Sequence, residues 1–163
     1  MIAIADEAGL PLVIAGSGPE EARLRKLAAA ARVPVTFEVR PSKERLRELY
    51  WGARALLFPA HEDFGIIPVE AMATGCPVIV NRVGGAAESA VDGVAGAHYD
   101  PDDASGYRAA IDLATGIRPE AARARALDFD TARFVDDVRD WVLGESAQAG
   151  ASSRPNSVSS ALG

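Results

Sequence analysis

Residues 59–79, with the sequence PAHEDFGIIPVEAMATGCPVI, decide the fold because they run from the end of one apolar segment to the start of the next. The first apolar run ends at Phe58, so Glu62 lies in a loop at the carboxyl end of an expected strand. Pro68 suits the first turn of a helix, and Gly75 can end that helix in the left-handed conformation. The next apolar run then follows. This order of strand, loop, helix and strand predicts a βαβ unit with parallel strands.

The same alternation extends to both sides and predicts an α/β fold. Apolar runs bounded by turn residues indicate strands, and spacings of three and four indicate amphipathic helices. We expect strands over 12–15, 35–39, 55–58, 77–80 and 97–99, and helices over 20–31, 107–114, 120–127 and 131–143. These elements predict one Rossmann-like domain over residues 1–143, with a parallel sheet of about five strands and helices on both faces. Trp51 and Trp141 lie on apolar helical faces and are expected in the core.

The last residues differ in composition from the rest of the chain. Residues 144–163 are rich in Ser, Ala, Gly and Pro. Such a segment buries too little apolar area to offset the entropy lost on ordering. We therefore expect a disordered tail over residues 144–163.

Composition and charge exclude several classes of function. The chain has 163 residues, 17 Lys plus Arg against 23 Asp plus Glu, and a formal net charge of -6. An acidic field repels phosphate backbones, so nucleic acid is not the expected partner. Cys76 is the one cysteine and cannot form an internal disulfide, and two histidines do not make a zinc site. The sequence starts without a signal peptide and contains no membrane-spanning run, so a cytoplasmic location is expected.

The loop and helix of residues 59–79 carry groups suited to a phosphorylated sugar. Glu62 lies in the loop at the carboxyl end of a strand, where open α/β sheets bind ligands, and Glu70 follows in the helix. Gly65 allows the backbone to approach a ligand, and the helix start beyond it offers N–H groups to an anion. Carboxylates accept hydrogen bonds from hydroxyls, so ribose or hexose hydroxyls fit Glu62 and Glu70.

The Glu-x7-Glu spacing from Glu62 to Glu70, followed by Glu-Ala-Met-Ala-x-Gly-x-Pro-Val-Ile, resembles the donor-site signature of family 4 retaining glycosyltransferases. Residues 12–19 are similar to that family's strand and Gly-x-Gly-Pro turn, and residues 83–93 to its Gly-Gly-x-x-Glu loop. The resemblance covers roughly residues 2–143. It implies the C-terminal, donor-binding half of a GT-B fold.

The resemblance also implies roles for individual residues. Glu70 would accept hydrogen bonds from the donor ribose, and Glu62, the catalytic candidate, would face the donor hexose. The other donor-binding candidates lie on three loops: Phe64, Gly65, Ile66, Gly16, Gly18 and Arg40. The expected reaction transfers a hexose with retention at the anomeric carbon, without an obligatory metal or other cofactor.

The resemblance further suggests a donor and an acceptor. The phrase Glu-Asp-Phe-Gly-Ile-x-Pro-Val-Glu is most like bacterial mannosyltransferases of polysaccharide assembly, which favours GDP-mannose over a UDP-sugar. The acceptor would be a glycan or a lipid-linked sugar, bound through an N-terminal domain that the sequence lacks. In the intact enzyme, the location could be peripheral to the inner face of the membrane.

The sequence also departs from the family pattern. It lacks the N-terminal domain and the opening strand of the donor domain, with the Arg and Lys that neutralise the diphosphate, so this chain alone is expected to be inactive. In the doubly wound order 3-2-1-4-5-6 the missing strand is central, and either its two neighbours pair or the sheet is frayed. One alternative is a non-catalytic or truncated module that packs against a partner chain. Another is a sugar-nucleotide epimerase of the same fold.

Overall fold

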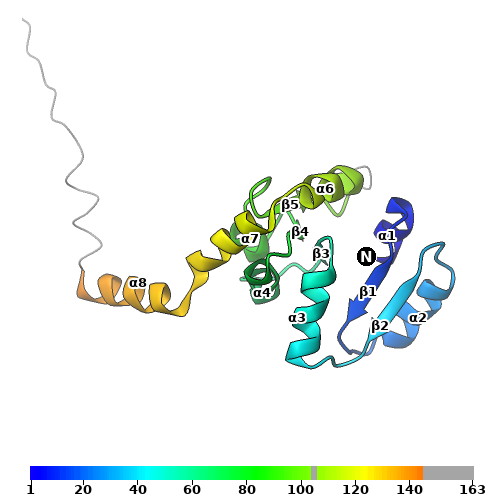
Figure 1. Ribbon diagram of the computed structural model, residues 1–163, viewed down its shortest axis with the longest axis horizontal. Coiled ribbons are helices and arrows are strands. Elements are labelled where there is room, and N and C mark those ends of the chain that lie inside the picture. Colours follow the sequence, from blue (N-terminus) through cyan, green and yellow to red (C-terminus); the bar gives the residue numbers. More distant parts are fainter. Residues whose placement is uncertain (104–105, 145–163) are drawn as a thin grey trace, which may run out of the picture. The chain divides into compact units, whose positions relative to one another are not determined.

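The computed structural model describes residues 1–103 and 106–144, and the chain divides into two compact units, Met1–Leu127 and Asp128–Gly163. The first unit alternates helices and strands, which confirms the α/β class (Figure 1). Its elements are α1 (Ile2–Ala8), β1 (Leu12–Ala15), α2 (Glu21–Ala29), β2 (Val35–Glu38), α3 (Lys43–Gly52), β3 (Leu56–Phe58), α4 (Ile66–Thr74), β4 (Val78–Asn81), α5 (Gly85–Ser89), β5 (Gly96–Tyr99), α6 (Gly106–Thr115), α7 (Pro119–Ala126) and the 3₁₀ turn η1 (Leu127–Phe129), which crosses the boundary between the units.

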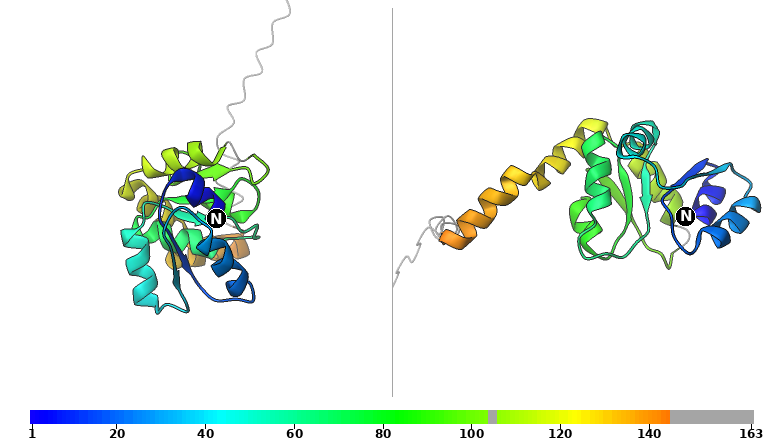
Figure 2. Two further views of the ribbon diagram at one scale, coloured as in Figure 1. Left: turned by 90° about the vertical axis from the view of Figure 1, so that its right-hand side faces the viewer. Right: turned by 90° about the horizontal axis from the view of Figure 1, so that it is seen from below.

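The strands form two parallel sheets, whereas we expected one sheet of about five strands. β1 pairs with β2, with Leu12 opposite Val35. β3, β4 and β5 form a second sheet in that order, with Val78 of β4 between Leu56 and Gly96. The division falls between β1 and β3, the two strands expected on either side of the central position of the sheet. These neighbours do not pair with each other, and Figure 2 shows β1 and β2 set apart from the three-stranded sheet.

The core of the first unit surrounds the three-stranded sheet. All four residues of β4 are buried, as expected for a parallel strand covered on both faces. Val78 and Val80 pack in a cluster with side chains of α3, α4, α5 and α7, including Tyr50 and Met72. Ile79 packs in a separate cluster with β5 and α6. Because successive strand residues point to opposite faces, this arrangement gives the sheet helices on both sides.

The β1–β2 sheet is covered far less completely. No residue from Asp6 to Leu49 is buried, and α2 contributes no buried side chain. Val13, at the centre of β1, is 48% exposed. A parallel strand is usually enclosed on both faces, and among residues 1–103 and 106–144 β1 pairs with β2 alone. This half of the unit therefore has little apolar burial.

The described part of the second unit is α8 (Thr131–Leu143) with the residues before it. The Asp130 side chain accepts a 2.8 Å hydrogen bond from the Ala132 amide and caps the helix start. The expectation that both tryptophans are buried is wrong: Trp51 is 62% and Trp141 is 76% exposed. On α3 the buried residue is the neighbouring Tyr50, whereas Trp51 lies beside the Arg47 guanidinium, 5.4 Å from its ring centroid. None of the residues of α8 is buried. The expected tail lies, apart from Gly144, outside the described residues.

Within residues 1–103 and 106–144, no helix has both the length and the apolar character needed to cross a membrane.

Candidate functional site

The loop from His61 to Gly65, here called loop 61–65, connects β3 to α4 and is held by the turn that follows β4. The Gly85 amide donates a 2.8 Å hydrogen bond to the Glu62 carbonyl. A Cβ on Gly85 would lie 2.0 Å from the Asp63 carbonyl oxygen, and one on Gly84 would lie 2.7 Å from the His61 ring. Only glycine permits so close an approach of two backbone segments. The Gly84–Gly85 pair therefore fixes the path of loop 61–65.

Loop 61–65 ends in a left-handed residue that starts helix α4. Gly65 has φ 79° and is buried, and a Cβ placed on it would lie 3.0 Å from the Ala86 Cβ. Beyond it, the first N–H groups of α4 have no partner within the helix and carry the positive end of its dipole. Phe64 and Ile66, on either side of Gly65, are 55% and 62% exposed. This segment can thus present backbone donors to an anionic ligand.

The two candidate carboxylates lie at the two ends of this segment. Glu62 is exposed in loop 61–65, and Glu70 is exposed on α4. Among the described residues, neither side chain forms a hydrogen bond or an ion pair. Both carboxylates are therefore available to accept hydrogen bonds from ligand hydroxyls.

Tyr50 and Cys76 are buried side chains in the core next to the candidate site. Burial, with a further contribution from the Glu70 carboxylate, raises the pKa of Tyr50 to about 12. Burial raises the pKa of Cys76 to about 11, and its thiol lies 3.4 Å from the Pro77 carbonyl oxygen. A thiol with this pKa stays protonated at neutral pH, so Cys76 is a small buried core residue and not a nucleophile.

The remaining candidates gather at the carboxyl ends of β1 and β2. The Gly16 amide donates a 3.0 Å hydrogen bond to the Glu38 carbonyl, which joins the two strand ends. Gly16 has φ 138°, and Arg40 has φ 50°, a left-handed conformation that is uncommon for a residue with a side chain. The Arg40 Nε lies 3.4 Å from Ser17 Oγ, next to Gly18. The structure thus brings Gly16, Gly18 and Arg40 together as a second group.

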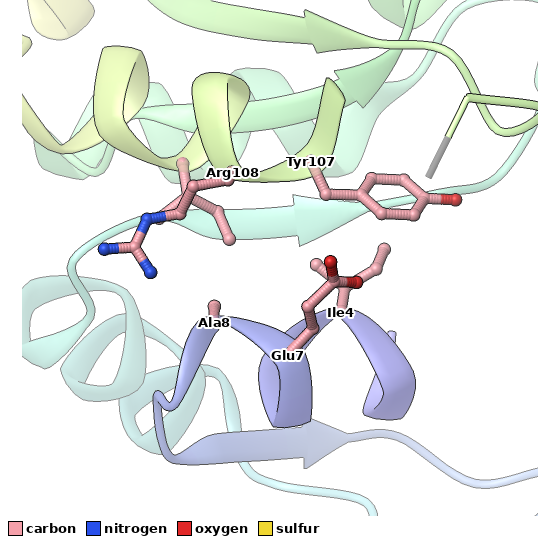
Figure 3. Close-up of a pocket in the computed structure, with 6 residues that line it drawn as sticks. Ile4, Glu7, Ala8, Tyr107 and Arg108 are labelled. Carbon is pink, nitrogen blue, oxygen red and sulfur yellow. The ribbon is translucent and has the colours of Figure 1, made fainter. Parts of the chain in front are cut away.

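Two pockets of the first unit are lined by other residues than the candidates. One pocket of about 120 Å³ is lined by Ile4, Glu7 and Ala8 of α1 and by Tyr107, Arg108 and Ile111 of α6. Figure 3 shows the α1 residues opposite Tyr107 and Arg108. Sites for drug-sized ligands usually measure about 300–1,000 Å³, so this pocket is small for a nucleotide sugar. The other, of about 500 Å³, lies along α6 and the start of α7. The carboxylate candidates Glu62 and Glu70 are exposed on the surface.

The metal-free expectation remains a prediction. Among the described residues, no three His, Cys, Asp or Glu side chains are grouped closely enough to hold a metal ion.

Sequence reasoning missed two parts of the site's support. Helix α5 falls in a stretch that reads as loop because glycines interrupt it, although the Gly-Gly-x-x-Glu motif marked its start. Arg125 on α7 donates 2.8 Å hydrogen bonds to the carbonyls of Glu88 and Ser89, at the end of α5. No local pattern signals this contact, because its partners are backbone atoms 36 and 37 residues away.

Comparison with known proteins identifies relatives of this chain. The family model described as "Glycosyl transferases group 1" matches residues 2–126. A D-inositol 3-phosphate glycosyltransferase of Acidothermus cellulolyticus is 37% identical over 141 residues, covering 78% of this chain and 31% of the relative. A glycogen synthase of Mycobacterium tuberculosis is 33% identical over 132 residues, covering 75% of this chain and 32% of the relative. The chain thus spans about a third of the length of these relatives.

Solved structures agree with the fold. The Anabaena protein HepE in complex with UDP-glucose superposes with a TM-score of 0.67 at 21% identity, over 88% of this chain and 44% of that one. The pneumococcal O-GlcNAc transferase GtfA, in complex with UDP and GlcNAc, also gives a TM-score of 0.67 at 21% identity, over 88% of this chain and 31% of that one.

Proposed function

Because this chain belongs to the group 1 glycosyltransferase family, we propose that its first unit binds a nucleoside diphosphate hexose as the sugar donor. The observation that carries the proposal is the arrangement of loop 61–65 and α4. Glycine contacts from the turn after β4 hold that loop, and Glu62 and Glu70 are exposed and unpaired among the described residues.

The proposed roles follow from the chemistry of each group. A carboxylate can accept hydrogen bonds from two neighbouring hydroxyls, so Glu70 would bind the ribose and Glu62 the hexose. The backbone amides around Gly65 and the start of α4 would bind the diphosphate and sugar hydroxyls, since helix N-termini favour anions. Two HepE crystal structures contain UDP or UDP-glucose, which supports a nucleotide-sugar ligand for this fold.

The second group would complete the donor site. Gly16 and Gly18 lack side chains that would block a ligand from the backbone at the end of β1. Arg40 carries a guanidinium, which pairs with phosphate oxygens or stacks on a nucleobase. We therefore place the nucleobase and part of the diphosphate at this group, and the ribose and hexose at Glu70 and Glu62.

The proposed reaction is retaining hexosyl transfer. The bond between the anomeric carbon and the diphosphate oxygen breaks, a bond to an acceptor hydroxyl oxygen forms, and that hydroxyl loses its proton. Backbone donors fixed at the diphosphate would stabilise the charge that develops on the leaving group. The chain spans about a third of its curated relatives, so we propose donor binding for this chain and catalysis only together with an acceptor-binding domain. GDP-mannose and a cytoplasmic location remain predictions from the sequence.

Calorimetric titration with UDP-glucose, GDP-mannose, UDP and GDP tests this proposal, after circular dichroism has shown that the chain folds. We expect saturable binding of one nucleotide and its sugar. Glu70→Ala should weaken that binding by about tenfold to a hundredfold, because hydrogen bonds to a charged group contribute roughly 1.5–3 kcal/mol.

The matched control is Glu7→Ala, which removes an exposed carboxylate at the pocket between α1 and α6. It should leave the dissociation constant unchanged. Absence of binding by the folded chain would overturn the proposal and favour a non-catalytic module that packs against a partner chain.

A further inference from the structure

Two arginines on α7 reach the carboxyl ends of two other helices. Arg123 Nη2 donates a 3.0 Å hydrogen bond to the Thr74 carbonyl at the end of α4. Arg125 donates through Nε to the Ser89 carbonyl and through Nη2 to the Glu88 carbonyl, both at 2.8 Å. The last carbonyls of a helix lack partners within it, and a cation there also interacts favourably with the helix dipole. The planar guanidinium of Arg125 thus holds the end of α5 at two points.

Helix α5 in turn contacts loop 61–65 at three places. The Gly85 amide donates to the Glu62 carbonyl, and Gly65 packs against Ala86. Ser89 Oγ lies 3.4 Å from the Phe64 carbonyl oxygen and 3.2 Å from that of Gly85, within hydrogen-bonding reach of both. Ser89 therefore connects α7 to loop 61–65: its carbonyl accepts a hydrogen bond from Arg125, and its hydroxyl contacts the Phe64 carbonyl.

We propose that Arg125 is a positioning residue for sugar-donor binding, which acts through α5 on loop 61–65. The inference rests on the function proposed above, because that loop is where the hexose and diphosphate are placed. Arg125 reaches the backbone of α5 through the carbonyls of Glu88 and Ser89. Its removal should let α5 shift and loosen the amides around Gly65, while Glu70 on α4 keeps its place.

Helix α7 does not depend on Arg125 to stay packed. Ala122 and Ala126, on the same helix, are 0% and 8% exposed in the core cluster that contains Met72 of α4. Arg125→Met keeps an apolar stem of similar length but loses the guanidinium, so it should leave α7 packed on α4. Arg125→Lys retains the positive charge and a donor, and it also serves if the Met variant does not fold.

The test combines one measurement without ligand and one with ligand. Amide hydrogen exchange followed by NMR reports whether the Gly85 hydrogen bond to Glu62 persists. Titrations with UDP-glucose and GDP-mannose probe the whole site, whereas UMP and GMP lack the hexose and the second phosphate. The control is Arg108→Met, since within the described part of the chain Arg108 hydrogen-bonds to Asp112 of its own helix, at 3.4 Å, and to no other residue.

We expect the Gly85 amide of Arg125→Met to exchange about tenfold faster, because local opening depends on the contacts that close a segment. The affinity for the nucleotide sugar that the unchanged chain binds should fall about fivefold to tenfold. The affinity for the matching nucleoside monophosphate, UMP or GMP, should stay within about twofold of the value for the unchanged chain. Arg125→Lys should have an exchange rate and a nucleotide-sugar affinity between those of Arg125→Met and the unchanged chain. Arg108→Met should have the same exchange rate and affinity as the unchanged chain.

The proposal is overturned if the folded Arg125 variants keep the Gly85 exchange rate and the nucleotide-sugar affinity. It is also overturned if they lose nucleotide sugar and monophosphate equally, which indicates a general structural effect. If the unchanged chain binds no nucleotide sugar, the proposed function fails. Gly85 exchange then decides by itself whether Arg125 holds loop 61–65: an unchanged rate overturns that role, and a faster rate supports it.

Discussion

The Gly85 amide lies 2.8 Å from the Glu62 carbonyl oxygen and donates a hydrogen bond to it, which joins the turn after β4 to the loop after β3. This contact requires glycine, because a Cβ at position 85 would lie 2.0 Å from the Asp63 carbonyl oxygen and 2.4 Å from its carbon. Both are backbone atoms, so they cannot move aside as the end of a flexible side chain does. The contact therefore couples the position of α5 to the loop that carries Glu62.

Gly85→Ala should displace loop 61–65 and lower both stability and donor affinity. Relief of the clash requires the backbone to shift, and overpacking of this kind typically costs about 1–3 kcal/mol. Urea unfolding measures the loss of stability, and calorimetry measures the loss of affinity. Gly52→Ala is the control, because the space around Gly52 is empty and it ends α3. Equal stability and affinity in the two variants would contradict this account of the Gly85 contact.

Met72→Ala should be among the most destabilising single changes in the first unit. Met72 is 0% exposed between the three-stranded sheet and its helices. Loss of a fully buried Met side chain leaves a cavity and costs about 2–5 kcal/mol. Leu27→Ala, on α2, removes a side chain that is 46% exposed and should cost less than about 1 kcal/mol. Similar costs for both changes would show that the core is not where the structure puts it.

Stability should fall at alkaline pH because of Cys76. Burial raises the pKa of its thiol from 9.0 to about 11, so the protonated form is favoured in the folded state. The resulting stability is fully present below about pH 9 and is lost as the pH rises toward 11. The free energy of unfolding should decline there by up to ~1.4 kcal/mol per pH unit.

Cys76→Ala provides the comparison for this pH dependence. It should show a shallower decline between pH 8.5 and 10, before Tyr50 adds its own effect. If chemical denaturation gives the same slope for both proteins, Cys76 is not the group responsible.

Hydrogen exchange should distinguish the two sheets. The Leu12 amide donates to the Pro34 carbonyl at 3.0 Å and the Leu56 amide to the Pro77 carbonyl at 2.9 Å, so the two hydrogen bonds are closely matched. Leu12, however, belongs to the sheet with little apolar burial, and local stability follows such burial. We expect its amide to exchange at least about tenfold faster than that of Leu56. Equal rates would mean that β1 and β2 are as stable as the core sheet.

The strands were predictable from the sequence because buried parallel strands read as short apolar runs between turn residues. All five expected runs coincide with strands to within a residue or two. The division into two sheets was not settled in advance, since it depends on whether the edges of β1 and β3 can meet in space. Helix α5 was not predicted, because Gly85–Ser89 is too short to show a helical period.

The candidate site shows the same limit. The spacing from Glu62 to Glu70 is local, and both carboxylates are exposed on one loop and the helix that follows it. The support from Arg125 is not local, because it joins α7 to backbone carbonyls of α5. Trp51 was expected in the core for a related reason: spacing along α3 does not show which of its apolar residues faces the core, and Tyr50 is buried while Trp51 is exposed.

The most direct test of the central claim, that the first unit binds a sugar nucleotide at loop 61–65 and α4, is an NMR titration of the chain with UDP-glucose and with GDP-mannose. The account predicts that one of them produces the largest saturable amide shifts at Gly65, Ile66 and Gly85. Shifts confined to the pocket between α1 and α6, at Ile4 and Ile111, or no shifts with either ligand, would contradict it.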